Sequence, residues 1–369
     1  MKLAILAGET SGDNYGALLI ESIKNLSPDT FIAGTGGSRM REKLNLSIEG
    51  LPYGKMGFSG VFGNLPLFYR SFRKIKKEVE RLKPDIVVFI DNPGFNLKMA
   101  RALGRKFSCC YYIPPKIWAH NYGRIRTIKE YIRAVIPVFD FEEEIYRKEG
   151  VPCRWFGHPA VDLLLKVQAE KVEKHHDGGK VPVVGLLPGS RQEEIASLLP
   201  AFIHIANLLK QKIQFEIMLS AADSDIRRSE EFILKKHGVK LNIIEGPPYK
   251  VIDNSDLLLA ACGTVNLEVA LAGKPLLVFY KTSVLNYVLA KMMVKLKLFS
   301  PVNLLYGKKI VPEYIQNFSY ARVVDDCLDI LNRGELYARQ TESFRTFRSK
   351  TGDGGVSARA AELILGLAK

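Results

Sequence analysis

One pattern recurs along the whole chain: a short apolar run, a polar or glycine-containing break, then a segment with helical periodicity. In the first half the apolar runs are Lys2–Leu6, Thr30–Thr35, Ile86–Ile90, Ser108–Ile113 and Arg133–Pro137. In the second half they are Pro182–Leu187, Gln214–Leu219, Leu241–Glu245, Asp256–Ala260 and Pro275–Tyr280. Strands that alternate with helices in this way are joined by crossover connections, so the pattern predicts an α/β fold with parallel sheets covered by helices on both faces.

The length and the position of a polar break predict two domains. A chain of 369 residues is long for one compact core. The segment 173–180 is polar, contains glycine and separates the two series of strands, so it is the expected linker. We expect an N-terminal Rossmann-like domain at 1–172, a second at 181–350, and a terminal segment at 351–369 whose helix, Val356–Leu367, could return to the first domain. Two such domains facing across a cleft place ligands at the carboxyl ends of both sheets.

Composition restricts the class of protein. The five cysteines form no C-x-x-C pair and are typical of reduced thiols in a cytoplasmic protein. The apolar run at the N-terminus is too short for a signal peptide, and no run reaches the ~18 residues of a membrane-spanning helix. We therefore expect a soluble chain or one that rests on a membrane surface. The net charge of +14 suits anionic partners such as a nucleotide, a phospholipid surface or a nucleic acid.

Much of the positive charge lies beside apolar side chains. The segment 70–83 (RSFRKIKKEVERLK) is strongly basic and follows the apolar stretch 57–69 (GFSGVFGNLPLFY). Cations next to phenylalanine and leucine describe an element that lies in a lipid interface, as does 285–298 (LNYVLAKMMVKLKL). An ordinary amphipathic core helix is the alternative for each. RNA binding stays open on charge alone, although no RNP, KH or helix-turn-helix signature accompanies it.

The turn after the first strand carries carboxylates where a phosphate-binding loop would carry none. Its glycines at 8, 12 and 16 fit neither G-x-G-x-x-G nor a P-loop. Asp13 either caps the following helix or belongs to a site. Glu9 comes just past the end of the first strand, where a cleft would open. It is either an active-site carboxylate or a loop residue that forms hydrogen bonds.

Two more strand ends in the first half carry candidate site residues. Asp91 follows the apolar run 86–90 and could act as a general base on a hydroxyl, or cap the Asn92-Pro93 turn. The loop 111–120 (YYIPPKIWAH) holds Trp118 and His120. Its aromatic and cationic residues could bind a sugar ring or an acyl chain, or pack between domains.

Two strand ends in the second half resemble a nucleotide site. In LLPGSRQEEI (186–195), Gly189 and Ser190 precede a helix N-terminus and Arg191 offers a bidentate fork for a diphosphate. An ordinary helix-capping motif would account for Ser190 and Glu193, but it does not require an arginine at position 191. In CGTVNLEVALAGKP (262–275), Gly263 and Thr264 precede a helix in which Glu268 could hold the two hydroxyls of a ribose.

Together these motifs resemble lipid-A-disaccharide synthase, a family of inverting GT-B glycosyltransferases, over nearly the whole chain. The resemblance rests on 7–13 (AGETSGD), 56–66 (MGFSGVFGNLP), 89–96 (FIDNPGFN), 111–120, 156–162 (FGHPAVD), 186–195, 262–275 and 300–316 (SPVNLLYGKKIVPEYIQ). It implies that UDP-2,3-diacylglucosamine and 2,3-diacylglucosamine 1-phosphate react to a β-1,6-linked disaccharide 1-phosphate and UDP. It implies no metal or other cofactor, no nucleic acid, a homodimer, and a place at the inner face of the cytoplasmic membrane.

The resemblance also assigns roles to individual residues. Asp91 matches the base for the acceptor 6-hydroxyl, and Arg191 matches the ligand of the diphosphate. The remaining UDP contacts are Gly189, Ser190, Gly263, Thr264 and Glu268; the substrate contacts are Ser11, Asp13, Trp118, His120, Asn303 and Gln316; the membrane contacts are Phe58, Val61, Phe62, Leu65, Leu67, Phe68, Tyr69, Arg70 and Arg73.

One position departs from the family pattern. Many members carry a second aspartate where this chain has Gly94. If that carboxylate were the base, Glu9 would take the role here. The alternative functions are a UDP-sugar 2-epimerase of the same two-domain plan and a non-catalytic nucleotide-binding protein of the membrane surface.

Overall fold

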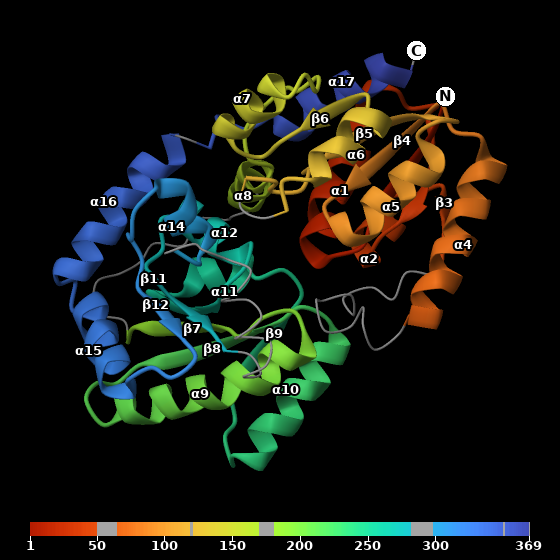
Figure 1. Ribbon diagram of the computed structural model, residues 1–369. Helices are drawn as coiled ribbons and strands as arrows, with labels where there is room; N and C mark the ends of the chain where they lie inside the picture. The colour runs from red at the N-terminus through yellow and green to blue at the C-terminus, as the bar shows by residue number, and fades with distance from the viewer. Residues whose placement is uncertain (50–64, 119–120, 170–180, 282–297, 350, 369) are drawn as a thin grey trace. The chain divides into compact units, whose positions relative to one another are not determined.

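The computed structural model describes residues 1–49, 65–118, 121–169, 181–281, 298–349 and 351–368 (Figure 1). The chain divides into two compact units, Met1–Leu163 with Thr351–Lys369, and Leu164–Lys350. The division falls inside helix α8 (Ala160–Ala169), before the predicted linker 173–180, which lies outside the described residues. Each unit is described below by itself.

Unit 1 is built on a parallel sheet of six strands in the order β3-β2-β1-β4-β5-β6. The strands are β1 (Lys2–Ala7), β2 (Phe31–Thr35), β3 (Leu46–Ser47), β4 (Ile86–Ile90), β5 (Ser108–Tyr112) and β6 (Ala134–Ile136). The central strand β4 is buried along its whole length, as expected for a strand covered on both faces. Its register pairs Leu6 with Phe89 on one side and Phe89 with Tyr111 on the other.

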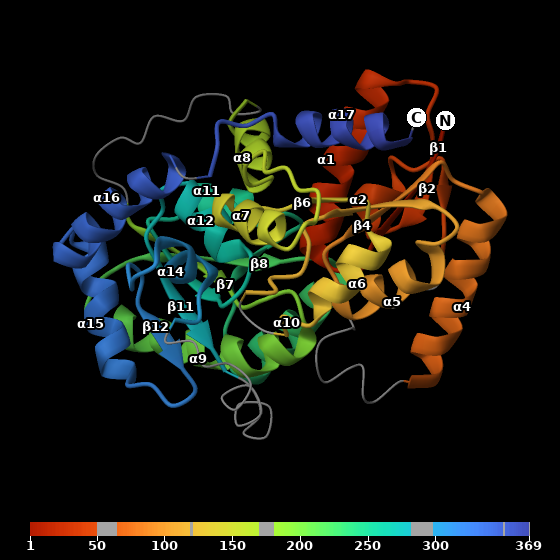
Figure 2. The ribbon, with the colours of Figure 1, turned by 45° about the horizontal axis from the view of Figure 1, so that its top comes forward.

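Helices cover both faces of this sheet. They are α1 (Thr10–Leu26), α2 (Ser38–Arg41), α4 (Leu65–Leu82), α5 (Pro93–Leu103), α6 (Arg124–Tyr131), α7 (Asp140–Lys148), the first part of α8, and α17 (Val356–Ala368). The terminal helix α17 packs along α1 and against β4 and β5, and Figure 2 shows α1 and α17 side by side. The N–H groups of Val356 and Ser357 donate to the carboxylate of Asp162, at 3.1 and 2.7 Å, which fixes the start of α17 within unit 1.

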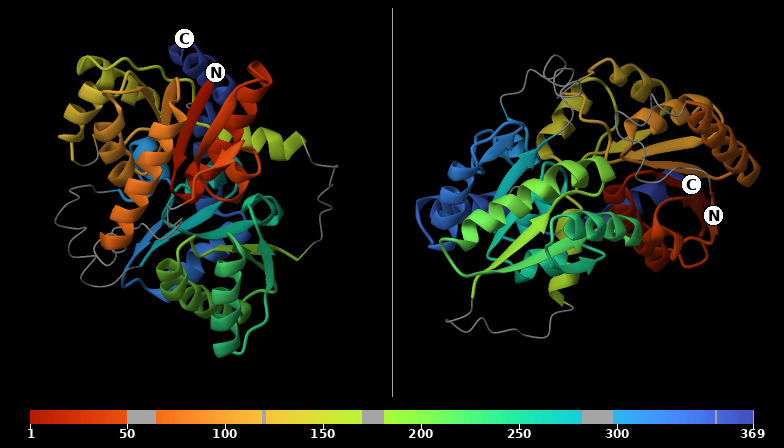
Figure 3. Two further views of the ribbon diagram at one scale, coloured as in Figure 1. Left: turned by 90° about the vertical axis from the view of Figure 1, so that its right-hand side faces the viewer. Right: turned by 90° about the horizontal axis from the view of Figure 1, so that it is seen from below.

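Unit 2 repeats the same sheet. Its six parallel strands run in the order β12-β11-β10-β7-β8-β9. They are β7 (Val183–Leu187), β8 (Glu216–Ala221), β9 (Asn242–Glu245), β10 (Leu257–Ala261), β11 (Leu276–Tyr280) and β12 (Glu313–Ile315). The helices are α9 (Gln192–Lys210), α10 (Ser224–Lys236), α11 (Tyr249–Asn254), α12 (Val265–Leu271), α14 (Pro301–Tyr306), α15 (Tyr320–Leu331) and α16 (Glu335–Ser349). Helices α9, α10 and α15 pack together, as both views of Figure 3 show for α9 and α10.

The predicted fold class is confirmed. In both sheets the strand order is that of a Rossmann fold, with the reversal between the first and fourth strands of the unit. All ten predicted strands are present, with ends within a few residues of the expected ones. The edge strands β3 and β12 were not predicted. The turn after β1 is shorter than the predicted stretch 7–13, because α1 begins at Thr10 and places Ser11 and Asp13 in its first helical turn.

A buried carboxyl in unit 2 supplies a stability prediction. Glu230 of α10 is 0% exposed, and neither carboxyl oxygen has a hydrogen-bond partner among the described residues. Burial raises the pKa of Glu230 to about 8, and the neighbouring Glu231 adds to that effect. The folded state therefore binds more protons than the unfolded state between pH 4.5 and 8, so this group's contribution to stability is complete below that range and lost as pH rises through it.

We expect Glu230→Gln to raise the free energy of unfolding at pH 8 by up to about 4 kcal/mol, because the pKa rises from 4.5 to about 8 and one pKa unit corresponds to about 1.4 kcal/mol. At pH 4.5 the variant and the natural chain should have nearly equal stability. Denaturant unfolding at the two pH values measures this difference. The control is Glu231→Gln, because Glu231 is exposed and paired with Arg227 at 2.9 Å. Equal gains from both substitutions at pH 8 would contradict the role of burial.

Candidate active site

In unit 1 the sheet reverses its order between β1 and β4, and two predicted carboxylates follow these neighbouring strands. Glu9 comes just after β1 and is the N-cap residue of α1, and Asp91 follows β4 directly. The reversal point of an open parallel sheet is where such folds bind ligands, at the carboxyl ends of the strands. The hydroxyl of Ser11, in the first turn of α1, donates to Oδ2 of Asp91 at 3.4 Å. The structure thus brings Ser11 and Asp91 together at this edge.

Asp91 lies in an unusual turn. Asp91 and Asn92 both have positive φ, at 49° and 43°, in the left-handed region that favours glycine. The side-chain nitrogen of Asn92 lies over Gly8, where a Cβ atom would come within 2.3 Å of it. The β1–α1 turn therefore needs a glycine at position 8 so that the two turns can pack against each other. A Cβ atom at Gly94 would meet nothing within 4 Å in the part of the chain that the structure describes, which leaves room there for the second aspartate of the family pattern.

Asp13 has a role in the fold. Its carboxylate oxygens accept hydrogen bonds from the backbone N–H groups of Met40 at 2.9 Å and Arg39 at 3.2 Å, at the start of α2. Burial raises the pKa of Asp13, while these N–H groups oppose the rise. The predicted substrate contact stays a prediction; in this structure both oxygens of Asp13 accept N–H groups of α2, a helix other than its own.

Trp118 is likewise held inside unit 1. Its indole N–H donates to Oε1 of Glu142 at 2.9 Å, and its ring meets Phe141 edge-on at 5.1 Å between centroids. Burial raises the pKa of Glu142 to about 6, and the indole hydrogen bond opposes that rise. Trp118 remains partly exposed, while its N–H is engaged by Glu142. His120 lies outside the described residues.

The motif 156–162 contains a histidine that no sequence argument selected. His158 is buried, stacks on Phe139 and meets Tyr15 edge-on. Its Nδ1 accepts the backbone N–H of Ala160 at 3.1 Å. Burial, with the nearby charge of Lys116, lowers the pKa of His158 to about 3, so the imidazole is neutral. We interpret it as a packing residue at the start of α8.

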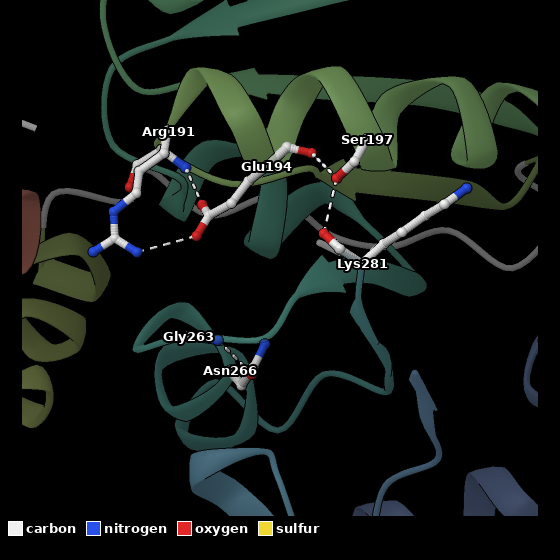
Figure 4. Close-up of polar contacts among 7 residues, drawn as sticks. Arg191, Glu194, Ser197, Gly263, Asn266 and Lys281 are labelled. Carbon is white, nitrogen blue, oxygen red and sulfur yellow. Dashed lines mark hydrogen bonds and ion pairs between the residues drawn. The ribbon is translucent and has the colours of Figure 1, made fainter. Parts of the chain in front are cut away.

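In unit 2 the reversal of strand order lies between β7 and β10, where the predicted nucleotide motifs are (Figure 4). Gly189 follows β7 with φ 121°, and a Cβ atom there would lie 2.4 Å from Oε2 of Glu194. Glu194 accepts the N–H of Ser190 at 3.3 Å and pairs with the guanidinium of Arg191 at 3.2 Å. Arg191 is the N-cap residue of α9 and its side chain is 42% exposed. A guanidinium at the positive end of a helix is suited to a diphosphate.

The second predicted nucleotide motif is the turn after β10, the strand next to β7 in the sheet. The N–H of Gly263 donates to Oδ1 of Asn266 at 3.0 Å, and Nδ2 of Asn266 donates to the carbonyl of Ala261 at 2.9 Å. These bonds shape the turn that carries Thr264 into α12. Glu268, one turn further, is 6% exposed. Among the described residues, nothing outside the immediate chain neighbours lies within 4 Å of a Cβ position at Gly263, so the backbone there is open to a ligand.

Gln316 and Asn303, the two remaining residues of unit 2 that were predicted to bind substrate, lie in different surroundings. Gln316 follows β12 at the same edge of the sheet, has φ 56°, and donates its N–H to the carbonyl of Tyr280 at 2.8 Å. Asn303 is 0% exposed. Its Oδ1 accepts the N–H groups of Ile310 and Val311, and its Nδ2 donates to Val311 and Glu313. Asn303 is therefore corrected to a residue that holds the α14–β12 loop.

Of the predicted membrane contacts, Phe58, Val61, Phe62 and the side chain of Leu65 lie outside the described residues. Leu67 and Tyr69 on α4 are 44% and 62% exposed, and Arg70 and Arg73 are exposed as well. Phe68 is 7% exposed and meets Phe95 edge-on at 5.6 Å. Phe68 is thus corrected to a core residue. Among the described residues, no helix is both long and apolar enough to cross a bilayer.

Comparison with solved structures shows the fold. The structure is similar to UDP-GlcNAc 2-epimerase from Methanocaldococcus jannaschii in complex with UDP-GlcNAc and UDP, with a TM-score of 0.65, 18% identity, and coverage of 99% of this chain and 100% of that chain. It is also similar to MurG from Acinetobacter baumannii, with a TM-score of 0.52, 12% identity and 99% of each chain covered.

Comparison of sequences shows the family. The model of the family described as lipid-A-disaccharide synthetase matches residues 3–363. The lipid-A-disaccharide synthase of Geobacter sulfurreducens is 32% identical over 375 residues, covering 99% of this chain and 96% of that protein. That of Solibacter usitatus is 30% identical over 374 residues, covering 99% and 97%. The resemblance drawn from the motifs is confirmed, and the chain belongs to the lipid-A-disaccharide synthetase family of glycosyltransferases.

Proposed function

We propose that this enzyme joins UDP-2,3-diacylglucosamine to 2,3-diacylglucosamine 1-phosphate and releases the β-1,6-linked disaccharide 1-phosphate and UDP. Membership of the family supports lipid A disaccharide synthesis, and the proposal names the two substrates. The observation that carries it is the pair of sites at the reversal points of the two sheets. One holds Asp91 and Ser11, and the other holds Arg191 at a helix N-terminus.

The reaction is a single displacement. The 6-hydroxyl of the acceptor attacks C1 of the donor, the bond from C1 to the diphosphate oxygen breaks, and the configuration at C1 inverts. Asp91 takes the proton of the hydroxyl. Arg191 and the N–H groups at the start of α9 stabilise the charge that develops on UDP as it leaves. Carboxylates at the unit 1 edge favour positive charge at C1 and would repel a diphosphate, which supports a nucleotide site on unit 2.

Mass spectrometry of a mixture of both acyl sugars with the protein tests the proposal. We expect UDP and the tetraacyl disaccharide 1-phosphate in equal amounts. A parallel incubation with UDP-N-acetylglucosamine alone tests the epimerase alternative. This alternative is included because the fold is similar to that of UDP-GlcNAc 2-epimerase. An epimer without disaccharide would overturn the proposal. UDP binding and vesicle binding without any product would instead indicate the non-catalytic alternative.

The acylated substrates also call for contact with the inner face of the cytoplasmic membrane, and α4 supplies a candidate surface. Leu67 and Tyr69 are exposed apolar side chains beside the exposed cations Arg70 and Arg73. Apolar side chains inserted between anionic headgroups, with cations beside them, are typical of interfacial helices.

We expect Leu67→Glu with Tyr69→Glu to weaken binding to phosphatidylglycerol-containing vesicles at least tenfold, since losing about 1.4 kcal/mol of partition free energy suffices for this. Vesicle sedimentation measures the binding. The matched control is Phe232→Glu, which removes an apolar side chain that is 72% exposed on α10 of unit 2. Equal losses in both variants would exclude α4 as the specific contact.

A further inference from the structure

Two buried side chains hold the turn that carries Asp91 through hydrogen bonds to its backbone. The carbonyl oxygen of Asp91 accepts the hydroxyl of Tyr111 at 2.7 Å and Nδ2 of Asn96 at 2.8 Å. The N–H of Asp91 donates to the carbonyl of Tyr112 at 3.3 Å. Tyr111 comes from β5, the strand beside β4, and Asn96 from the first turns of α5. Two elements thus converge on one peptide group.

This peptide group needs such support. Asp91 and Asn92 are consecutive non-glycine residues with left-handed φ, a conformation that persists only where the surroundings enforce it. A peptide that rotated toward ordinary extended or helical geometry would swing the Asp91 side chain away from Ser11. The contact between Ser11 Oγ and Asp91 Oδ2, at 3.4 Å, is a long hydrogen bond. The backbone therefore has a large part in setting where the carboxylate points.

The two donors are well suited to this task. Tyr111 is 0% exposed and Asn96 is 1% exposed, so water does not compete for the carbonyl. Burial raises the pKa of Tyr111 well above its usual value, and its hydroxyl keeps its proton across the working range of an enzyme. Asn96 donates from the same nitrogen to the carbonyl of Ile90 at 3.1 Å, which ties the turn to the end of β4.

We propose that Tyr111 is a positioning residue for the reaction: its hydroxyl, with the amide of Asn96, holds the Asp91 peptide in the left-handed turn and so aims the carboxylate at the acceptor hydroxyl. The inference rests on the proposed function, in which Asp91 is the base. It predicts that losing the Tyr111 hydroxyl slows the chemical step and leaves substrate binding intact.

The chain offers a matched control next to Tyr111. Tyr112 is also 0% exposed and belongs to the same strand, but its side chain points to the opposite face of the sheet. Among the described residues, none of the hydrogen bonds of the Asp91 turn involves the Tyr112 hydroxyl. Tyr112→Phe thus removes the same atom from the same strand without touching the turn.

Steady-state transfer with both acyl sugars tests the proposal in the full chain. For Tyr111→Phe we expect kcat to fall at least tenfold, with KM for each substrate and the Kd for UDP within about twofold of the natural chain. Tyr112→Phe should keep kcat within twofold. Asn96→Asp, which keeps the shape but removes the donor, should reproduce the loss of kcat and leave the Kd for UDP unchanged.

Two results would overturn the inference. One is a kcat for Tyr111→Phe within twofold of the natural chain. The other is an equal loss of kcat and of melting temperature in Tyr111→Phe and Tyr112→Phe, which indicates only a structural role. Asp91→Asn in the same assay separates this inference from the proposed function. Full activity of Asp91→Asn overturns the base assignment itself, whereas an inactive Asp91→Asn beside a normal Tyr111→Phe overturns only the role of Tyr111.

Discussion

Asp91→Asn should lower kcat for disaccharide formation about a thousandfold and leave the fold and the Kd for UDP unchanged. The substitution keeps the size of the side chain and removes only its capacity to accept a proton. A positioned general base contributes about 10²- to 10⁴-fold to such a reaction. Because Arg191 and the turn after β10 belong to the other unit, nucleotide affinity should not respond. Coupled detection of UDP release together with mass spectrometry of the disaccharide measures the loss.

The control lies at the other end of the same strand. Asp85 precedes β4, and its carboxylate accepts the N–H of Lys2 at 2.7 Å at the amino edge of the sheet. Asp85→Asn should keep kcat within twofold. Glu9→Gln tests the alternative base that the glycine at position 94 leaves open. If Glu9→Gln loses a thousandfold while Asp91→Asn loses only a few-fold, the assignment of the base moves from Asp91 to Glu9.

The sequence predicted the sheets well because their signal is local. Strands such as Ile86–Ile90 and Leu257–Ala261 are continuous apolar runs, and both are fully buried in the structure. The edge strands Leu46–Ser47 and Glu313–Ile315 have two and three residues, too few for any periodicity. They exist because a neighbouring strand offers unpaired backbone groups, which is a tertiary effect.

The site residues also show that contacts between distant parts of the chain cannot be read from the local sequence. The position after a strand predicted that Asp91 and Arg191 would lie at the carboxyl edges of their sheets, because the topology of parallel sheets alone fixes this edge. It could not predict that Asp13 would cap α2, since the partner N–H groups of Arg39 and Met40 are remote in sequence. Asn303 was expected to bind substrate because of the family resemblance, and a motif does not reveal which way an amide faces.

The residues that sequence reasoning missed are buried donors. Tyr111 and Asn96 lie inside motifs that were recognised, in 111–120 and 89–96, yet neither has a polar signature of its own. Their importance follows from one acceptor, the carbonyl of Asp91, which only the folded chain brings to them. Positive φ at two successive non-glycine residues was the structural signal that pointed to them.

Arg191→Ala is expected to weaken UDP binding about a hundredfold and to lower transfer further, because the guanidinium gains interactions as the diphosphate takes up charge. Charge-assisted hydrogen bonds are worth about 1.5–3 kcal/mol each, and the substitution removes a bidentate fork. It also leaves Glu194, the present partner of Arg191, as an uncompensated negative charge beside the arriving anion. Arg191→Lys should recover only part of the affinity, since an ammonium keeps the charge but not the fork.

Isothermal titration with UDP, followed by transfer kinetics, distinguishes this role from a merely structural one. Arg227 is the matched control, because it belongs to the same unit, is 43% exposed against 42% for Arg191, and forms a similar pair with Glu231. Arg227→Ala should bind UDP as the natural chain does. Glu194→Gln should bind UDP at least as tightly, since it removes negative charge from the site while Arg191 stays at the start of α9. If Arg191→Ala binds UDP within threefold of the natural chain, the guanidinium serves only its pair with Glu194, and the leaving group must be held by other residues.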